Sequence, residues 1–282
     1  MKYLIVSADD FGLTKSVNEG IAKARREGIV TSVNLFPSGE AFDDALRLAK
    51  ELGLKEAGAH LALTETIPVT DPSRIPTLVA TDGRFYGGRN QFLLRFILGM
   101  VDHDHIYTEL KAQMDAVIGA GITITDLSSH EHIHMVPGIL DVFVKLAKEY
   151  DIPAIRYPHK DISARPFGPD GLYKSFVLAF FEGGMARVLN QSSIRSPDHF
   201  RGFLDSANIT EEALLGILDS LEEGTTELVC HPGFLGPEVL DRYTFHANCE
   251  TELFALTSRR VRKRMEDRGI QLMTYGEFLS KP

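Results

Sequence analysis

The sequence contains no tryptophan and only two cysteines, Cys230 and Cys249, among its 282 residues. Two cysteines are too few for a disulfide framework, and their spacing is not the CxxC of a zinc clip or a redox pair. We therefore expect two reduced thiols and a fold held by its core. Hydrophobic residues make up 44% of the chain and charged residues 24%, which is ordinary for a soluble globular protein and excludes a disordered one.

The chain also lacks an excess of positive charge, because its formal net charge is −9. A surface that binds nucleic acid or anionic lipid needs clustered lysine and arginine. The only basic run, at 259–264, lies among glutamates in a helical pattern and is typical of a solvated helix face. The sequence therefore predicts neither a nucleic-acid partner nor a membrane partner.

Long hydrophobic runs are missing as well. The apolar start of the chain is interrupted by Asp9 and Asp10, well short of a signal-peptide core. The apolar stretches at 92–101 and 175–181 are too short to cross a bilayer. A cytoplasmic protein is the simplest interpretation.

What the chain does contain is an alternation of strand and helix patterns. Helical spacing of apolar residues follows most of the strand-like segments, as at 16–27 and 138–149. Parallel strands need such crossover connections. Seven segments have strand character: 3–6, 32–36, 56–62, 122–127, 154–157, 227–230 and 271–273. We predict an α/β protein with a (β/α) barrel-like fold, an incomplete seven-stranded barrel being compatible, in one domain over 1–282.

Three long connections interrupt this alternation. The segment 64–104 carries several prolines and glycines and no strand pattern of its own. Loops of such length in a compact domain usually serve function, so we expect this segment to cover a substrate. The segments 158–170 and 232–249 are candidates for the same role.

Residues capable of chemistry fall at the ends of the predicted strands. The carboxyl ends of barrel strands converge on one face, where active sites are built. Four strands bring aspartate or histidine to that face: Asp9, Asp10, His60, His130, His132, His134 and His231.

A carboxylate with two imidazoles suits a divalent metal that keeps positions open for water and substrate. Of two adjacent carboxylates, one can bind the metal while the other acts as a base. Each residue also has a plainer explanation, since a lone histidine is often structural and Asp9-Asp10 could form a turn or a helix cap. Three histidines in five residues are rarely needed for packing alone, and spacing leaves all three in play.

The remaining candidates carry less weight. His103 and His105 suit surface or capping roles, and His159, His199 and His246 stand alone in the sequence. Arg156, at another strand end, could hold a substrate oxygen, an active-site carboxylate or a structural ion pair. The sequence has no GxSxG elbow, P-loop or GxGxxG motif.

Four ordered motifs together resemble the YdjC-like carbohydrate deacetylase family, which includes chitooligosaccharide deacetylases and proteins associated with hopanoid biosynthesis. The resemblance extends from Tyr3 to about Phe278. The motifs are Ala8-Asp9-Asp10-Phe11-Gly12, Gly58-Ala59-His60-Leu61, Ser129-His130-Glu131-His132-Ile133-His134-Met135 and Cys230-His231-Pro232-Gly233.

The resemblance implies a β/α barrel-like deacetylase with one divalent metal held by Asp10, His60 and His130. It further implies Asp9 as the catalytic base and His231 as the general acid or oxyanion partner. Family resemblance points to magnesium, whereas two imidazoles favour zinc, manganese or cobalt.

The chain departs from the family pattern at two positions. It has Ser128 where the family usually has an aspartate, so a carboxylate behind the site would be missing. It has Cys249 where relatives have an arginine, which puts a sugar-binding role of that position in doubt.

The predicted function is metal-dependent amide hydrolysis that releases acetate from an N-acetylated sugar or oligosaccharide. A non-catalytic carbohydrate- or metal-binding protein remains an alternative, although it would not need a spare carboxylate beside the ligand. A glycoside hydrolase would instead need two carboxylates flanking the scissile bond and no metal. A homodimer is left open.

Overall fold

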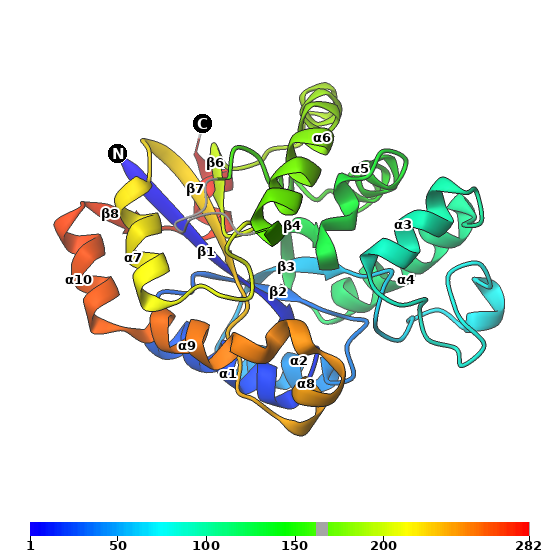
Figure 1. Ribbon diagram of the computed structural model, residues 1–282, viewed down its shortest axis with the longest axis horizontal. Helices are drawn as coiled ribbons and strands as arrows, with labels where there is room; N and C mark the ends of the chain where they lie inside the picture. The colour runs from blue at the N-terminus through cyan, green and yellow to red at the C-terminus, as the bar shows by residue number, and fades with distance from the viewer. Residues whose placement is uncertain (162–168, 282) are drawn as a thin grey trace.

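The computed structural model describes residues 1–161 and 169–281, and its centre is a curled parallel sheet (Figure 1). The strand order is β5-β4-β3-β2-β1-β7-β6, and β8 pairs with the first residues of β1. The strands are β1 (Lys2–Phe11), β2 (Ser32–Leu35), β3 (Glu56–Leu61), β4 (Thr123–Ser129), β5 (Ala154–Ile155), β6 (His199–Arg201), β7 (Gly224–Cys230) and β8 (Ile270–Leu272). The predicted incomplete (β/α) barrel is confirmed.

All seven predicted strand segments correspond to strands, but β6 was missed. This strand has only three residues, and two of them are polar, so it is too short to show a period. The open side of the barrel lies between β5 and β6. There Ala154 of β5 forms an isolated parallel bridge with Arg195, which precedes β6 in the chain.

Helices surround the sheet, and several begin at a polar cap. The helices are α1 (Lys15–Glu27), α2 (Phe42–Glu51), α3 (Arg89–Ile97), α4 (His103–Gly119), α5 (Ile139–Glu149), α6 (Pro169–Ser192), α7 (Glu211–Ser220), α8 (Pro237–Arg242), α9 (Cys249–Thr257), α10 (Arg259–Asp267) and α11 (Tyr275–Ser280), with 3-10 turns η1 (Pro72–Arg74), η2 (His130–Met135) and η3 (Thr244–Asn248). The basic run at 259–264 lies in α10, directly after α9. Ser258 separates them, because its extended backbone ends α9 and its hydroxyl caps α10.

Alternation along β1 divides the molecule into two packed regions. Leu4, Val6 and Ala8 join the main core between sheet and helices. Ile5 faces the other way, into a smaller cluster inside the barrel that includes Tyr275 of α11. The barrel interior is therefore apolar near the amino ends of the strands. Buried polar side chains begin at the level of this cluster, where Glu227 is the strand neighbour of Ile5, and continue toward the carboxyl ends.

The long connections are more structured than expected. The segment 64–104 contains η1, a bridge between Val79 and Phe85, and all of α3, so the expectation of an irregular loop was wrong for 89–97. The segment 232–249 forms α8 and η3. Most of 158–170 lies outside the described residues. No described helix combines the length and the hydropathy that a membrane span requires.

One close backbone contact fixes the loop after β7 against α1. A β-carbon added at Gly20 of α1 would lie 2.3 Å from the Cα atom of Gly233. No atom can occupy that space without movement of the helix or the loop. Glycine at position 20 is therefore required by close approach, although it lowers helix propensity.

We expect Gly20→Ala to lower the free energy of unfolding by about 1–3 kcal/mol, the usual cost of overpacking a close contact. Gly119→Ala, at an exposed helix position with no neighbour within 4 Å, is the matched control and should be neutral or slightly stabilising. Urea denaturation of both variants measures the difference. Equal stabilities would show that the α1 contact is not tight.

Candidate active site

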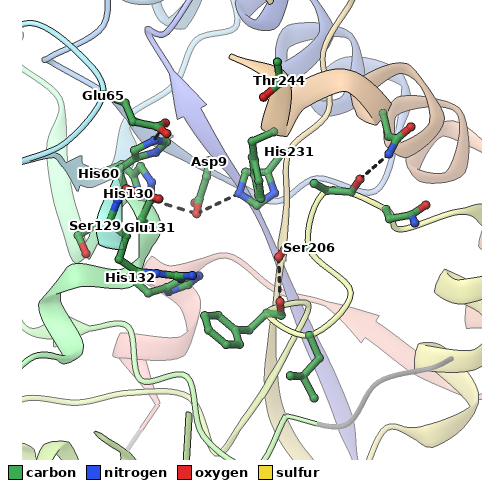
Figure 2. Close-up of a pocket in the computed structure, with 17 residues that line it drawn as sticks. Asp9, His60, Glu65, Ser129, His130, Glu131, His132, Ser206, His231 and Thr244 are labelled. Carbon is green, nitrogen blue, oxygen red and sulfur yellow. Dashed lines mark hydrogen bonds and ion pairs between the residues drawn. The ribbon is translucent and has the colours of Figure 1, made fainter. Parts of the chain in front are cut away.

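A cavity of about 510 Å³ opens at the carboxyl ends of the strands (Figure 2). Asp9, His60, His130 and His231 line it, as the predicted convergence of strand ends requires. The long connections supply part of the wall, and the loop 203–208 after β6 supplies another part. Glu65 and Arg89 come from 64–104, and Thr244, Phe245 and Asn248 come from 232–249.

A break in the geometry of β1 brings Asp9 and Asp10 to the same place. Neighbouring residues of a regular strand point to opposite faces. Here the register of β1 against β2 shifts between Ala8 and Phe11, and Asp10 has a left-handed backbone with φ of 67°. Aspartate tolerates this conformation better than most residues. The bulge turns Asp10 away from the helix layer and toward His60 and His130, which line the cavity.

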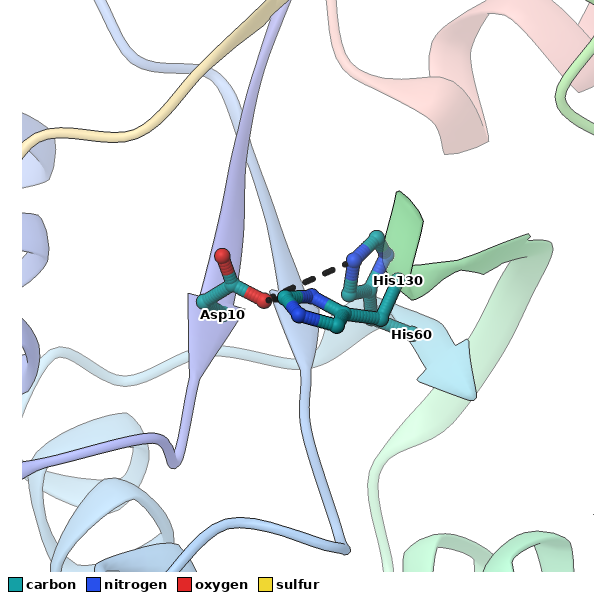
Figure 3. Close-up of side chains that lie close together, drawn as sticks. All are labelled: Asp10, His60 and His130. Atoms are coloured by element: carbon teal, nitrogen blue, oxygen red, sulfur yellow. Dashed lines mark hydrogen bonds and ion pairs between the residues drawn. The ribbon is translucent and has the colours of Figure 1, made fainter. Parts of the chain in front are cut away.

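Asp10, His60 and His130 form a compact cluster (Figure 3). One ligand atom from each lies within 4.8 Å of the others. Asp10 Oδ1 is 3.1 Å from His130 Nδ1 and 3.5 Å from His60 Nε2. These are the three residues that the resemblance implied as ligands. A carboxylate oxygen and two imidazole nitrogens at this separation fit one divalent ion with open coordination positions.

The far nitrogen of each imidazole already has a partner. His60 Nδ1 lies 2.8 Å from the Ser128 hydroxyl, and His130 Nε2 lies 3.1 Å from a carboxylate oxygen of Glu65. When a metal is bound, such outer partners keep the proton on the far nitrogen, so that the near nitrogen can present its lone pair to the metal. Ser128, where the family usually has aspartate, still contacts a site histidine. Glu65 supplies a carboxylate, but from another part of the chain.

The carboxylates around the cluster of Asp10, His60 and His130 stabilise a positive charge there. Burial opposes a charge on His130, but Asp10 and Glu65 outweigh this and raise the pKa of His130 well above its usual range. For His60 burial prevails and lowers its pKa to about 4, so that its imidazole is neutral and able to coordinate. The environment is thus suited to a cation bound between these groups.

His246, which stands alone in the sequence, was wrongly set aside as background. Its Nε2 lies 2.9 Å from Asp10 Oδ2, the oxygen that faces away from His130. The side chain is almost fully buried. No sequence signal distinguished His246 from His159 and His199, because its place at Asp10 depends on how 232–249 folds back over the strand ends.

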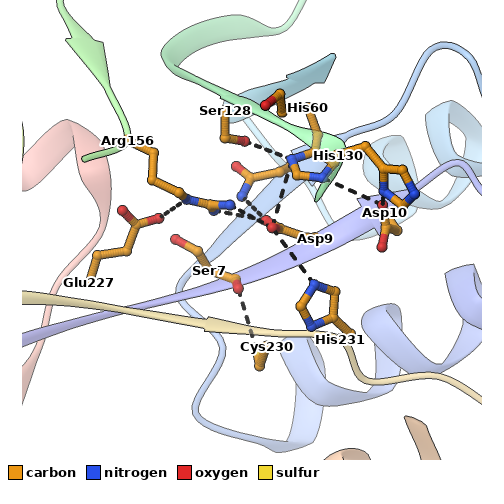
Figure 4. A network of polar contacts seen from close by, with 12 residues as sticks. Ser7, Asp9, Asp10, His60, Ser128, His130, Arg156, Glu227, Cys230 and His231 are labelled. Carbon is orange, nitrogen blue, oxygen red and sulfur yellow. Dashed lines mark hydrogen bonds and ion pairs between the residues drawn. The ribbon is translucent and has the colours of Figure 1, made fainter. Parts of the chain in front are cut away.

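The hydrogen bonds to Asp9 come from groups other than histidine, although His60 and His231 lie within 4.0 Å of its carboxylate (Figure 4). Arg156 donates two hydrogen bonds to its carboxylate, at 2.5 and 2.8 Å, and Asn34 donates a third at 2.5 Å. Burial would raise the pKa of Asp9, but Arg156 and His60 hold it well below the usual range. Of the roles left open for Arg156, the structure thus places it on an active-site carboxylate.

His231 directly follows β7 and lies on the opposite side of Asp9 from His60 (Figure 2). Its Nε2 lies 4.0 Å from Asp9 Oδ2, and its backbone N–H donates to Glu252. Burial lowers the pKa of the imidazole to about 4, so it is neutral at physiological pH. Figure 2 shows this ring facing the cavity.

The three histidines after β4 have three different environments. His130 joins the cluster with Asp10. His134 uses both nitrogens in buried contacts, with the Ser129 hydroxyl and the Arg156 carbonyl, and is structural. His132 lines the cavity, with its ring 4.9 Å from that of Phe203. The residues do not continue an extended strand, since Glu131 and His132 have left-handed backbones within η2. Alternation could not have separated them.

The remaining candidates lie away from the cavity. The ring of His103 packs on Phe96, and His105 contacts the Thr77 hydroxyl. Asp102, rather than either histidine, caps α4. Cys249 is buried, with its sulfur beside the backbone of Gly233.

Comparisons with known proteins agree with this geometry. A family model described as YdjC-like protein matches residues 3–267. A carbohydrate deacetylase from Brevibacillus brevis is 32% identical over 276 residues, covering 98% of this chain and 99% of that protein. A chitooligosaccharide deacetylase from Salmonella typhimurium is 31% identical, covering 95% and 96%.

A solved structure from Enterococcus faecalis, described as a cellobiose-phosphate cleavage protein, has a TM-score of 0.79 and 26% identity, and 98% of each chain is covered. The similarity in sequence and in three dimensions extends over nearly the whole chain. The predicted resemblance is therefore confirmed: this chain is an enzyme that belongs to the YdjC-like protein family.

Proposed function

We propose that the protein is a metal-dependent hydrolase that removes the acetyl group from an N-acetylated sugar or oligosaccharide, acting as a single domain. The observation that carries this proposal is that two adjacent carboxylates lie at one site in different surroundings. Asp10 lies among imidazoles, as a metal ligand would. Asp9 beside it is held by Arg156 and Asn34 and remains available for proton transfer. The names of the relatives support the sugar as substrate.

Asp10, His60 and His130 would hold the divalent ion. When bound, such an ion polarises an acyl oxygen and lowers the pKa of a water molecule. Two nitrogen ligands favour zinc, manganese or cobalt, whereas magnesium prefers oxygen ligands and is supported only by the family resemblance.

Asp9 would act as the base. Its carboxylate is ionised throughout the physiological range, because Arg156 stabilises the charge. A strongly stabilised anion has low proton affinity, so it accepts a proton efficiently only from an acidic donor. An acidified water molecule beside Asp10 would be such a donor. Arg156 and Asn34 also fix the carboxylate in one orientation, which favours transfer along a defined path.

His231 would return the proton to the leaving amine. It starts neutral, so the proton must come from the attacking water by way of Asp9, 4.0 Å away. Protonation of the amine nitrogen completes cleavage of the C–N bond, giving acetate and a free amino sugar. Donation of an N–H to the developing oxyanion is the alternative role for His231.

The long connections would bind the sugar. Glu65 and Arg89 come from 64–104 and provide charged groups on one side of the cavity, while Phe245 of η3 provides an aromatic face on another. Sugars combine hydroxyl groups with apolar faces, so a mixed wall suits them. We therefore retain the proposal that 64–104 covers the substrate.

Glycoside cleavage is the competing function, because the description of the Enterococcus faecalis protein names it. The site favours amide hydrolysis. A glycosidase needs a carboxylic acid and a carboxylate free to face the sugar. Asp10 is instead surrounded by imidazoles and Asp9 is paired with Arg156. The other two carboxylates that line the cavity, Glu65 and Glu131, are each hydrogen-bonded as well. Measuring acetate and reducing ends in the same reaction distinguishes the two chemistries.

Activity should require the ion, so chelation should abolish acetate release from N-acetylglucosamine oligomers, and added zinc, manganese, cobalt or magnesium should restore it. His60→Ala and His130→Ala should each weaken metal binding, because each removes one nitrogen ligand. His103→Ala, outside the cavity, is the control and should bind metal normally. Elemental analysis and acetate assays provide the readouts. Full turnover by verified metal-free protein would contradict the mechanism.

The two aspartates should separate metal binding from proton transfer. Asp10→Asn should lose both metal and activity, since a neutral amide is a poorer ligand. Asp9→Asn should retain the metal but lose roughly 10²–10⁴-fold in kcat, the usual contribution of a positioned base. Metal content and acetate release are measured side by side. Metal-free Asp9→Asn, or fully metallated Asp10→Asn, would reverse the assignment.

His246 should act on the metal site through Asp10. His246→Ala leaves Asp10 Oδ2 without its donor and should reduce metal affinity roughly 10- to 100-fold, as loss of an outer partner does. His246→Gln, which keeps an N–H donor, should recover most of that affinity. Competition with a metal indicator measures both. Equal affinities for His246→Ala and the unmodified protein would contradict the role.

A further inference from the structure

Behind Asp9, on the side away from the cavity, two more polar side chains are buried inside the barrel. Asn34 of β2 and Asp126 of β4 are fully buried. They lie on either side of Gly58 of β3. A β-carbon added at Gly58 would be 1.9 Å from Asn34 Oδ1 and 2.8 Å from Asp126 Oδ2. The two oxygens therefore border the same small space, which exists because residue 58 has no side chain.

The orientation of the Asn34 amide is determined by Asp9. Its Nδ2 lies 2.5 Å from Asp9 Oδ1. An ionised carboxylate only accepts hydrogen bonds, so the nitrogen must face Asp9 and the oxygen must face Gly58. No described group donates to that oxygen. A buried amide oxygen without a donor is costly and calls for an explanation.

Asp126 also has a buried oxygen atom that lacks a hydrogen-bond donor. Its Oδ1 accepts a hydrogen bond from the Thr125 hydroxyl at 2.9 Å, whereas its Oδ2 has no partner among the described residues. Thus two acceptor atoms face one space. If Asp126 were ionised, both oxygens would be unsatisfied and would repel each other. A proton on Asp126 Oδ2 would satisfy both with one hydrogen bond.

The charges around Asp126 oppose its ionisation. Arg156 is shared between Asp9 and Glu227, with its Nε 2.9 Å from Glu227 (Figure 4). Two carboxylates already balance this one cation. Tyr275 of α11 completes the surroundings by donating to Glu227. Burial, followed by the charge on Glu227, raises the pKa of Asp126 to about 8.

We propose that Asp126 is kept as a neutral carboxylic acid that donates its proton to Asn34 Oδ1, and that this bond positions Asn34 to hold Asp9 for catalysis. The catalytic part rests on the proposed function. Asp126 is a positioning residue, because it acts through Asn34 and does not reach the cavity. The chain of donors runs from Asp126 through Asn34 to Asp9.

The two hydrogen bonds that link Asp126 through Asn34 to Asp9 predict how activity depends on pH. Above about pH 8 Asp126 loses its proton, so Asn34 Oδ1 loses its donor and faces an added negative charge. The amide then no longer holds Asp9 in one orientation, and kcat falls. Asp126→Asn supplies a donor that cannot ionise. It should keep kcat within about twofold near neutral pH and lose this part of the alkaline decline.

Asp126→Leu is the matched variant, since it is similar in size but has no donor. It should lower kcat about tenfold with little change in KM, because one buried hydrogen bond is lost while the cavity is unchanged. If Asp126→Leu does not fold, the comparison of pH profiles between Asp126→Asn and the unmodified protein still decides the issue. Identical alkaline limbs would overturn the positioning role.

A test that does not depend on activity uses nuclear magnetic resonance on zinc-loaded protein. With carboxyl-labelled aspartate, the signal absent from Asp126→Asn identifies Asp126. It should have the chemical shift of a protonated acid at pH 6 and titrate near pH 8. The side-chain amide signals of Asn34 should shift with the same midpoint, and should not do so in Asp126→Asn. An Asp126 carboxylate already ionised at pH 6 would overturn the proposal.

The pH dependence of the free energy of unfolding provides a further test of the proton on Asp126. In the unfolded chain Asp126 releases its proton near its ordinary pKa of 3.8, whereas the folded protein retains it to about 8. Between these values the folded state binds more protons, so its stability falls as pH rises. The unmodified protein should lose stability relative to Asp126→Asn across this window and not beyond it. A constant difference would contradict a retained proton.

These measurements separate the two levels of inference. If no N-acetylated sugar releases acetate, the proposed function fails, but resonance and unfolding still decide whether Asp126 donates to Asn34. If acetate is released normally and Asn34 is insensitive to the protonation of Asp126, only the proposed positioning role of Asp126 is wrong.

Discussion

The buried guanidinium of Arg156 is the interaction on which the polar interior depends. It lies inside the barrel with no exposure to solvent and contacts both Asp9 and Glu227. Without it, two carboxylates would be buried with no compensating cation, at a cost of several kcal/mol each. With it, Asp9 can stay ionised at the edge of the cavity. The planar fork of arginine binds both oxygens of Asp9 and so fixes direction as well as charge.

A local departure from strand geometry places the two adjacent aspartates of the site in different surroundings. Because β1 bulges at Asp10, the two adjacent aspartates lie at one site but have different neighbours. Asp9 stays with Arg156 and the other inward side chains of the barrel, whereas Asp10 turns toward His60, His130 and His246. The different neighbours, rather than the residue type, give the carboxylates different proposed roles. Left-handed backbone at such a place is commonly associated with function.

Much of the fold and of the candidate site could be predicted from patterns within short segments of the sequence. The strand segments were visible as short apolar runs, and Asp9, Asp10, His60, His130 and His231 were found because chemistry in barrels concentrates at strand ends. Their motifs also carried the family resemblance. The strand β6, the helix α3 and the contact of His246 with Asp10 were not found. A three-residue strand has no measurable period, and a lone histidine in a long connection has no neighbour in sequence that reveals its partner.

By itself, the sequence determined the alternating α/β architecture, the convergence of aspartate and histidine at one end of the strands, and the family. Only the tertiary structure decided that Arg156 contacts both Asp9 and Glu227, and that Glu65 and Ser128 stand behind the imidazoles. The physical reason is the range of the interactions. Apolar periodicity reports how a segment meets the core, whereas each contact of the site joins residues from different strands or loops, often more than 60 positions apart.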